Sequence, residues 1–162
     1  MISISFTFTL STAGNANEPD IYHREMERYD PRQNTWTAMP CMNDARAYYS
    51  AVALEDGIYA IGGFDGSKWL NTVEKYNPRT NTWGYVRALS LPRSSFAATV
   101  LNGSIYIAGG FTGKHNVNTV EMYEPSLDQW SMICTLPMRR YGLQLVAVDV
   151  PWRKVVDDDD DG

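Results

Sequence analysis

The sequence predicts an all-β fold made of repeated four-stranded antiparallel sheets. The stretch NTVEKYNPRTNTW at residues 71–83 returns 47 residues later as NTVEMYEPSLDQW at residues 118–130, and a looser copy, REMERYDPRQNTW, occupies residues 24–36. A fixed period of this length indicates a repeat architecture. No segment of useful length combines helical periodicity with helix caps, so the repeated element is built from strands.

Each repeat divides into four short strands at its turn residues. In the second unit, strands are expected at residues 96–101, 105–108, 118–123 and around Trp130. Asn102-Gly103 separates the first two strands, because both residues tolerate the positive φ of a tight hairpin. Gly109-Gly110 ends the second strand, since missing Cβ atoms permit unusual φ or close approach of another backbone. Pro125 ends the third strand, because proline donates no ladder hydrogen bond.

The same pattern predicts a second complete unit and two partial ones. The strands expected in the first complete unit are YSAVAL, IYAI, NTVEKY and a fourth around Trp83, with turns at Asp56-Gly57 and Gly62-Gly63. The complete repeats span about residues 46–92 and 93–139. Two strands are expected near residues 24–37, a further strand in the alternating run Ile2 to Leu10, and a final first strand, YGLQLVAV, at residues 141–148.

One such unit cannot cover both of its faces, so the repeats must stack. Radial stacking around a common axis gives the blades of a β-propeller. Small residues are expected where the first strands crowd near the axis, at Ala51, Ala53, Ala97 and Ala98. Large aromatic pairs are expected to fill the wider space between blades, Tyr76 with Trp83 and Tyr123 with Trp130.

Composition limits the classes of partner. The formal net charge is −5, but residues 157–161 supply five of the 19 acidic residues, which leaves 14 acidic against 14 basic residues. A neutral body argues against nucleic-acid binding, and no apolar window reaches the roughly 18 residues of a membrane span. We expect a repeat region at residues 1–150 and an acidic disordered tail at residues 151–162.

The compartment and the start of the chain follow from two further features. Cys41 and Cys134 occupy nonequivalent repeat positions, so reduced thiols in a cytoplasmic protein are expected. The amino terminus lacks the basic leader and the unbroken apolar run of a secretory signal. The sequence therefore predicts a cytoplasmic chain with no signal peptide.

The glycine pairs and the spaced aromatics resemble the kelch repeat family over about residues 24–149. The resemblance rests on Gly62-Gly63 with Phe64-Asp65-Gly66, on Gly109-Gly110 with Phe111-Thr112-Gly113, and on the two NTVE stretches. The amino-acid sequence, especially residues 58–83, is most similar to the kelch-like subfamily. In that subfamily, BTB and BACK segments precede a six-bladed propeller. The resemblance implies the substrate-recognition propeller of a cullin-RING ubiquitin ligase adaptor. The 162 residues contain no BTB segment, so we expect a cullin to be recruited only through a BTB domain outside this chain.

The resemblance also implies that a protein substrate or peptide binds the propeller rim. The rim comprises the loop between the second and third strands and the loop between blades. Carried over by position, the partner-binding candidates are Phe64, Asp65, Lys68, Trp69, Phe111, Lys114, His115, Arg46, Tyr48, Arg93, Ser95 and Arg140. The arginines either grip a carboxylate-bearing peptide or cap loop carbonyls with their stems packed on the next blade. Trp69 breaks the repeat, since its counterpart is Asn116, and is a contact candidate.

The sequence also leaves two alternative functions and two ways to complete the ring open. An actin-binding or scaffold kelch protein without a ligase role is the alternative. A galactose-oxidase-like enzyme is remote, because copper needs ligands and the chain has only His23 and His115; no catalytic residue, metal or cofactor is predicted. About three blades do not close a ring of four to eight, so we expect a fragment of a longer protein in preference to a homodimer that completes the ring.

Overall fold

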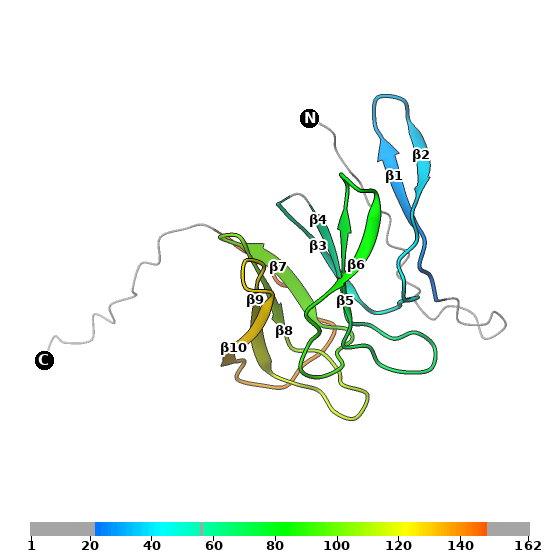
Figure 1. Cartoon of the computed structure of the whole chain (residues 1–162). Coiled ribbons are helices and arrows are strands. Elements are labelled where there is room, and N and C mark those ends of the chain that lie inside the picture. The colour runs from blue at the N-terminus through cyan, green and yellow to red at the C-terminus, as the bar shows by residue number, and fades with distance from the viewer. Residues whose placement is uncertain (1–21, 56, 149–162) are drawn as a thin grey trace, which may run out of the picture.

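The chain folds into three antiparallel sheets, one of two strands and two of four strands, that lie side by side (Figure 1). The computed structural model describes residues 22–55 and 57–148, which form ten strands and no helix. The all-β prediction is confirmed. Within the described residues, no helix is long and apolar enough to cross a membrane. The strand predicted from Ile2 to Leu10 and the tail predicted at residues 151–162 lie outside the described residues.

Two complete four-stranded sheets, blade A and blade B, follow the predicted repeats. Blade A consists of β3 (Ser50–Leu54), β4 (Gly57–Ile61), β5 (Val73–Asn77) and β6 (Thr82–Val86). Blade B consists of β7 (Ala97–Leu101), β8 (Ser104–Ala108), β9 (Thr119–Glu124) and β10 (Gln129–Thr135). In both blades each strand pairs antiparallel with the next one in the chain. All eight predicted strands are therefore confirmed in place and order.

A two-stranded half-blade precedes blade A. It consists of β1 (Met26–Asp30) and β2 (Thr35–Met39), which are equivalent to β5 and β6 one repeat later. Met26 is buried in one apolar cluster with Ile58 and Tyr76 of blade A, against which Met39 and Trp83 pack. The half-blade therefore covers one face of blade A, and blade B covers the other.

The hairpin prediction is confirmed in blade B and is wrong by one residue in blade A. Asn102 and Gly103 have φ of 50° and 75°, as a tight hairpin requires. In blade A the register pairs Leu54 with Gly57, so Gly57 belongs to β4 and is not a central turn residue. Glu55 takes the left-handed conformation there, with φ 55°. The repeat interval aligns Glu55 with Asn102, the first residue of the blade B turn, whereas the Asp-Gly composition favours a turn one residue later.

The strand predicted at residues 141–148 is absent from the sheets of the described residues. The first strand of a blade is held only by its second strand, and none of the described strands follows this segment. Its start is nevertheless attached to blade B, because the Gly142 N–H donates to the Ser95 carbonyl at 2.7 Å. The apolar pattern is that of a strand, but residues 22–55 and 57–148 supply no second strand to pair with it.

Blades A and B share a buried core. Its members come from both sheets and from the segment that joins them: Leu54, Tyr59, Ile61, Val73, Leu89, Phe96, Ile105, Ile107 and Tyr123. The rings of Tyr59 and Tyr123 meet edge to face with centroids 5.8 Å apart. The inner strands β3 and β7 contact each other, and Ala97 is buried there as predicted, whereas Ala53 is exposed. Burial of this shared apolar surface is what holds the two blades together.

The first glycine pair allows the two blades to approach closely. Gly62 and Gly63 have φ of 59° and 102°, which side chains rarely adopt. A Cβ atom on Gly62 would lie 2.3 Å from the main-chain oxygen of Arg93. The Gly63 N–H donates to that same oxygen at 2.8 Å. Both predicted reasons for the glycines, unusual φ and close backbone approach, are therefore confirmed.

A tyrosine, a tryptophan and a turn residue form one unit in all three copies. The ring pairs are Tyr29 with Trp36, Tyr76 with Trp83 and Tyr123 with Trp130, with centroids 4.9, 5.5 and 5.0 Å apart. The tyrosine hydroxyls donate to Oδ1 of Asn34, Asn81 and Asp128 at 2.8, 2.7 and 2.7 Å. Those three acceptors have left-handed φ, a conformation that asparagine and aspartate tolerate. The recurrent tyrosine thus fixes the turn that follows it.

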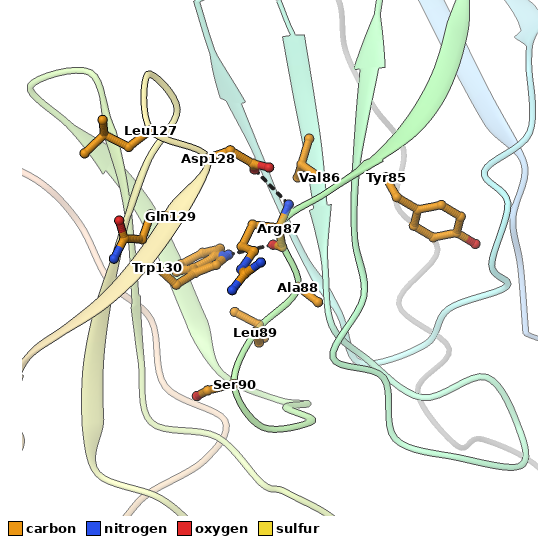
Figure 2. Close-up of a pocket in the computed structure, with 10 residues that line it drawn as sticks. All are labelled: Tyr85, Val86, Arg87, Ala88, Leu89, Ser90, Leu127, Asp128, Gln129 and Trp130. Carbon is orange, nitrogen blue, oxygen red and sulfur yellow. Dashed lines mark hydrogen bonds between the residues drawn. The ribbon is translucent and has the colours of Figure 1, made fainter.

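The recurrent tryptophan joins its blade to the preceding one. Trp83 Nε1 donates to the Pro40 carbonyl, and Trp130 Nε1 donates to the Arg87 carbonyl, both at 2.9 Å. Figure 2 shows the second joint, where the Arg87 N–H also donates to Asp128 Oδ1 at 2.8 Å. The predicted role of these aromatics between blades is confirmed, and the hydrogen bond adds orientation to their packing.

The second joint is expected to weaken in acid. The backbone N–H of Arg87 and the Tyr123 hydroxyl donate to the Asp128 carboxylate and lower its pKa. A lowered folded-state pKa adds stability above the unfolded value near 3.9, and that stability is lost as the pH falls below it. Asp128→Asn retains the acceptor oxygen and removes the titration. The fall in Tm between pH 7 and pH 3 should therefore be smaller in this variant, and an equal fall would contradict the assignment.

Candidate functional site

Arg46 and Arg93 are structural residues of their blades. Arg46 is 2% exposed, and its Nη1 donates to the carbonyls of Gly62 and Thr72 at 2.7 and 3.0 Å. Its Nη2 donates to Glu74 Oε1 at 2.8 Å. The arginine thus bridges the end of β4 to the start of β5 and neutralises a carboxylate that is itself 0% exposed.

Arg93 repeats the arrangement in blade B. It is 1% exposed and donates to the carbonyls of Gly109 and Thr119 and to the carboxylate of Glu121. Burial lowers the pKa of Arg93, and the charge of Glu121 opposes that shift. Of the two roles considered for these arginines, the structure shows the capping of loop carbonyls. The expectation that their guanidinium groups grip a partner is corrected for Arg46 and Arg93, because neither group reaches the surface.

The rim loops instead bring a row of aromatic rings together. Phe64 and Trp69 of the loop after β4 lie 4.7 Å apart between ring centroids. Tyr22 meets Phe64 edge to face at 5.6 Å, and Phe111 of the loop after β8 meets Trp69 at 5.9 Å. These loops lie at the bottom of Figure 1, at the end of the blades opposite the hairpin turns. Rings from three repeats therefore form one surface.

Asp65 holds the first rim loop in shape. Its Oδ1 accepts hydrogen bonds from the N–H groups of Ser67 and Lys68, both at 2.8 Å. Burial would raise the pKa of Asp65, but these donors outweigh it and the pKa is lowered. Asp65 was predicted as a contact residue; in the structure its carboxylate is occupied by the loop backbone and keeps Phe64 and Trp69 side by side.

A pocket of about 610 Å³ opens between the two rim loops, and we call it the rim pocket. Its lining comprises Tyr22, Tyr48, Phe64, Trp69, Ser94, Ser95, Phe111, Asn116 and Tyr141. The structure thus brings together five of the predicted contact residues, namely Tyr48, Phe64, Trp69, Ser95 and Phe111. None of the lining residues carries a charge. The rim pocket offers ring faces, hydroxyl groups and one carboxamide.

Two residues that line the rim pocket, Tyr48 and Ser95, occupy equivalent positions of successive repeats, and Gly142 is the next in the series. Tyr48, Ser95 and Gly142 all take left-handed φ, of 55°, 51° and 65°. The Ser95 N–H donates to the Tyr48 carbonyl at 2.8 Å, and the Gly142 N–H donates to the Ser95 carbonyl at 2.7 Å. A left-handed conformation costs a residue with a bulky side chain about 1–2 kcal/mol. The Tyr48 side chain is 39% exposed, so burial of its ring offsets this backbone cost only in part.

The remaining predicted residues do not line the rim pocket. Lys68, Lys114 and His115 are exposed on the two rim loops, and Arg140 is exposed on the segment after β10. The Arg140 backbone is fixed, since its N–H donates to Val117 and its carbonyl accepts from Gly110. The Lys68 ammonium lies 4.0 Å from Asp65 Oδ2 on its own loop.

Four lining residues were missing from the predicted set: Tyr22, Ser94, Asn116 and Tyr141. Asn116 belongs to the predicted rim loop, as the counterpart of Trp69, but not to the predicted contact residues. Tyr22 precedes the half-blade and Tyr141 follows blade B, so both lie outside the complete repeats. Positional transfer between the complete repeats could not find them, and the sequence signal for Tyr141 is its place directly after the predicted contact residue Arg140.

A larger hollow of about 1010 Å³ lies between β6 and β10 and belongs to the joint between blades. Arg87, Asp128 and Trp130 line it and are bonded to one another, while Tyr85 points away from them (Figure 2). Among residues 22–55 and 57–148, no group of three or more histidine, cysteine or acidic side chains is placed to hold a metal ion. The rim pocket is the candidate site, since it collects the predicted contact residues.

Comparison with known proteins identifies the repeats. The family model described as the Kelch motif matches residues 45–89 and 92–136, which together make up more than half of the chain. The chain therefore belongs to the kelch repeat family. The matched segments coincide with blades A and B together with the loops that carry Arg46 and Arg93.

Individual relatives carry kelch-like names. Kelch-like protein 5 of Homo sapiens is 46% identical over 48 residues, Kelch-like protein 1 of Mus musculus 42% over 48, and Kelch-like protein 28 of Homo sapiens 40% over 49. Each match covers 30% of this chain and 6%, 6% and 9% of the respective relative. The matched segments thus span less than a tenth of the curated relatives. The family supports a protein-interaction propeller.

A solved structure shares the fold. The protein described as "Structure of YjhT" superposes with a TM-score of 0.62 over 70% of this chain and 45% of that chain, at 20% sequence identity. At this identity the likeness concerns the fold alone. It agrees with the arrangement of blades A and B as neighbouring sheets of a propeller.

Proposed function

We propose that this chain is the substrate-recognition part of a cullin-RING ubiquitin ligase adaptor and that it holds its protein substrate at the rim pocket. The observation that carries the proposal is the uncharged aromatic pocket of about 610 Å³ formed by the rim loops of two adjacent blades. The resemblance to the kelch-like subfamily supports the ligase role, which is carried out in the cytoplasm.

The rim pocket has the properties of a protein-binding surface. Its loops are carried by rigid sheets, which is where recognition residues are usually found. Trp69 is 37% exposed and Tyr48 39%, so both present ring surface to the outside. Partly exposed aromatic residues are enriched among the few side chains that dominate binding energy. The lining side chains supply no paired acid and base, which favours recognition over catalysis.

Trp69→Ala is expected to weaken partner capture at least tenfold with little loss of folding stability. Removing the indole takes away the ring between Phe64 and Phe111, and tenfold corresponds to about 1.4 kcal/mol. Leu127→Ala is the matched control, because Leu127 is 63% exposed in the turn between β9 and β10. The measurement is the Kd for the captured partner by surface plasmon resonance. Equal affinities of the two variants would contradict the placement of the site.

The ligase role needs its own test. Sequencing of the full-length transcript should reveal an in-frame BTB domain, and the captured partner should become longer-lived when cullin neddylation is blocked. A partner whose lifetime is unchanged by both the block and gene silencing would remove the ligase role. Saturable co-sedimentation with actin filaments that Trp69→Ala abolishes would favour the cytoskeletal alternative.

A further inference from the structure

The face of blade B that points away from blade A repeats the apolar pattern of a buried face, and we call it the open face. Tyr106 lies between Ile105 and Ile107, which are buried in the shared core, so its side chain points to the opposite side of the sheet. The open face consists of the equivalents, one repeat later, of Leu54, Tyr59, Val73 and Val86, which pack in that core: Leu101, Tyr106, Val120 and Ile133. Val73 is 0% exposed, whereas its equivalent is only partly buried and Ile133 is 49% exposed. Blade B therefore offers an apolar face to a further blade.

The half-blade carries the opposite side of such a joint. Trp36 and Met39 are three residues apart in β2, so Trp36 lies on the face opposite to Met39, which packs on blade A. Trp36 is equivalent to the two tryptophans that donate across the joints, but it is 47% exposed and donates to no described residue. The acceptor carbonyls of those joints belong to Pro40 and Arg87, and the next member of that series is Cys134 at the end of β10. The half-blade and blade B thus carry the two sides of one further joint.

The segment after blade B occupies the place where a further blade begins. The Gly110 N–H donates to the Arg140 carbonyl at 2.8 Å, as the Gly63 N–H donates to the Arg93 carbonyl at the preceding joint. Residues 141–148 follow at the position of a first strand, whereas the half-blade supplies equivalents of a third and a fourth strand. The sequence predicts the intervening strand in the run Ile2 to Leu10, outside the described residues. The two ends of the described body therefore hold different strands of one blade.

Two copies of the chain have the size of a closed ring. The part of this chain that superposes on the solved structure of the same fold makes up 45% of that structure's chain, so two copies come close to its full length. The half-blade and blade B lie at opposite ends of the row of sheets (Figure 1). A contact between the half-blade of one copy and blade B of the other is therefore made twice in a symmetric pair. Two identical contacts close the assembly and leave neither face open.

We propose that two copies of this chain pair head to tail, with the half-blade of each copy packed on the open face of the other. The repeat count alone favours a fragment of a longer protein, whereas the described residues contain both sides of the joint that a second copy completes. The apolar side chains of the open face and the ring of Trp36 lose their contact with water in the pair, which drives the association. The pairing does not depend on the proposed function, because the rim pocket is formed within one copy.

Sedimentation velocity of the full chain between 1 and 200 µM measures the pairing. The mass should rise from 18.3 kDa to about twice that value and no further. Ile133→Asp places a charge on the open face and Trp36→Ala removes the ring that faces it, so each should raise the midpoint concentration at least tenfold. Both side chains are about half exposed in the single chain, so Tm at 1 µM should change little. Leu127→Asp, in the turn between β9 and β10 and outside the open face, is the matched control and should pair as the wild type does.

A mixture of the two variants tests the head-to-tail arrangement. The half-blade of the Ile133→Asp copy and the open face of the Trp36→Ala copy are both intact, so mixed pairs should form at concentrations where neither variant pairs alone. If Ile133→Asp lowers Tm, Ile133→Ser replaces it in both experiments.

Three results would overturn the pairing and leave the proposed function standing. A wild type that stays at the mass of one chain at 200 µM would assign the open face to blades of a longer protein. Pairing that Trp36→Ala leaves unchanged would show that two open faces meet each other. A mass that grows beyond two copies would show an open series of joints without ring closure. Partner capture that depends on Trp69 tests the proposed function separately, because Trp69 belongs to neither face of the joint.

Discussion

Glu74→Ala is expected to lower the free energy of unfolding by about 3–5 kcal/mol, the usual cost of removing one partner from a buried ion pair. Glu74 is 0% exposed and accepts a hydrogen bond from Arg46 Nη2 at 2.8 Å. It also accepts from the N–H groups of Asn43 and Asp44 at 2.7 and 3.1 Å, which ties the loop before blade A to β5. Without the carboxylate, the N–H groups of Asn43 and Asp44 lose their acceptor, and the buried Arg46 guanidinium keeps Asp44, 3.2 Å away and partly exposed, as its anionic partner.

The repeat provides a matched control for this variant. Glu27 occupies the equivalent position in the half-blade, where it is exposed and has no ion pair with any described residue. Glu27→Ala is expected to change stability by less than about 0.5 kcal/mol, as surface substitutions usually do. Urea unfolding followed by circular dichroism measures both variants. Similar losses for the two would show that the Arg46 pair does not stabilise blade A.

Trp83→Ala is expected to cost about 3 kcal/mol, at the low end for tryptophan truncation because the ring is only partly buried. The indole packs on the cluster that joins the half-blade to blade A, and its Nε1 donates to the Pro40 carbonyl at 2.9 Å. The truncation therefore removes both apolar contact and the hydrogen bond across the joint. Thermal unfolding should show a lower Tm. Because the lost contacts join the half-blade to blade A, the half-blade should detach at a lower temperature than in the wild type.

Two variants separate packing from hydrogen bonding at this joint. Trp83→Phe retains an aromatic ring and loses the donor, so a loss near 1 kcal/mol is expected. Trp36→Ala removes the equivalent ring of the half-blade, which is 47% exposed, and should cost clearly less than Trp83→Ala. A Trp36 variant as damaged as the Trp83 variant would mean that the tryptophan serves its own hairpin and not the joint between blades.

The order and position of the strands could be predicted because turn residues and the repeat interval give independent information. Asn102-Gly103 and the glycine pairs marked strand ends that the structure confirms. The two errors have a common origin in composition. Asp56-Gly57 looked like a turn by its residue types, and residues 141–148 looked like a strand by their apolar content. Register and a pairing partner decide such cases, and neither can be read from a short segment.

The candidate site was predictable as a set of loops but not as a set of roles. Arg46 and Arg93 recur in register because each hydrogen-bonds the loop carbonyls of its own blade. Their repetition is therefore a feature of the fold and not of the binding site. Trp69 interrupts the repeat and lines the pocket. Tyr22 and Tyr141 reach the pocket from outside the complete repeats, where the repeat interval carries no information. Departure from the repeat therefore marked Trp69, whereas Phe64 and Phe111 recur in register and line the pocket as well.

The joints between blades rely largely on main-chain oxygen atoms as acceptors. Trp83 bonds to the carbonyl of Pro40, Trp130 to that of Arg87, and Ser95 to that of Tyr48. Every amino acid supplies such an oxygen, so a neighbouring repeat can change its side chains without breaking the connection. Tandem duplication followed by divergence is therefore tolerated, because each new copy keeps the hydrogen bonds to its neighbour's main chain. The side chains on the surface of each copy can then change independently.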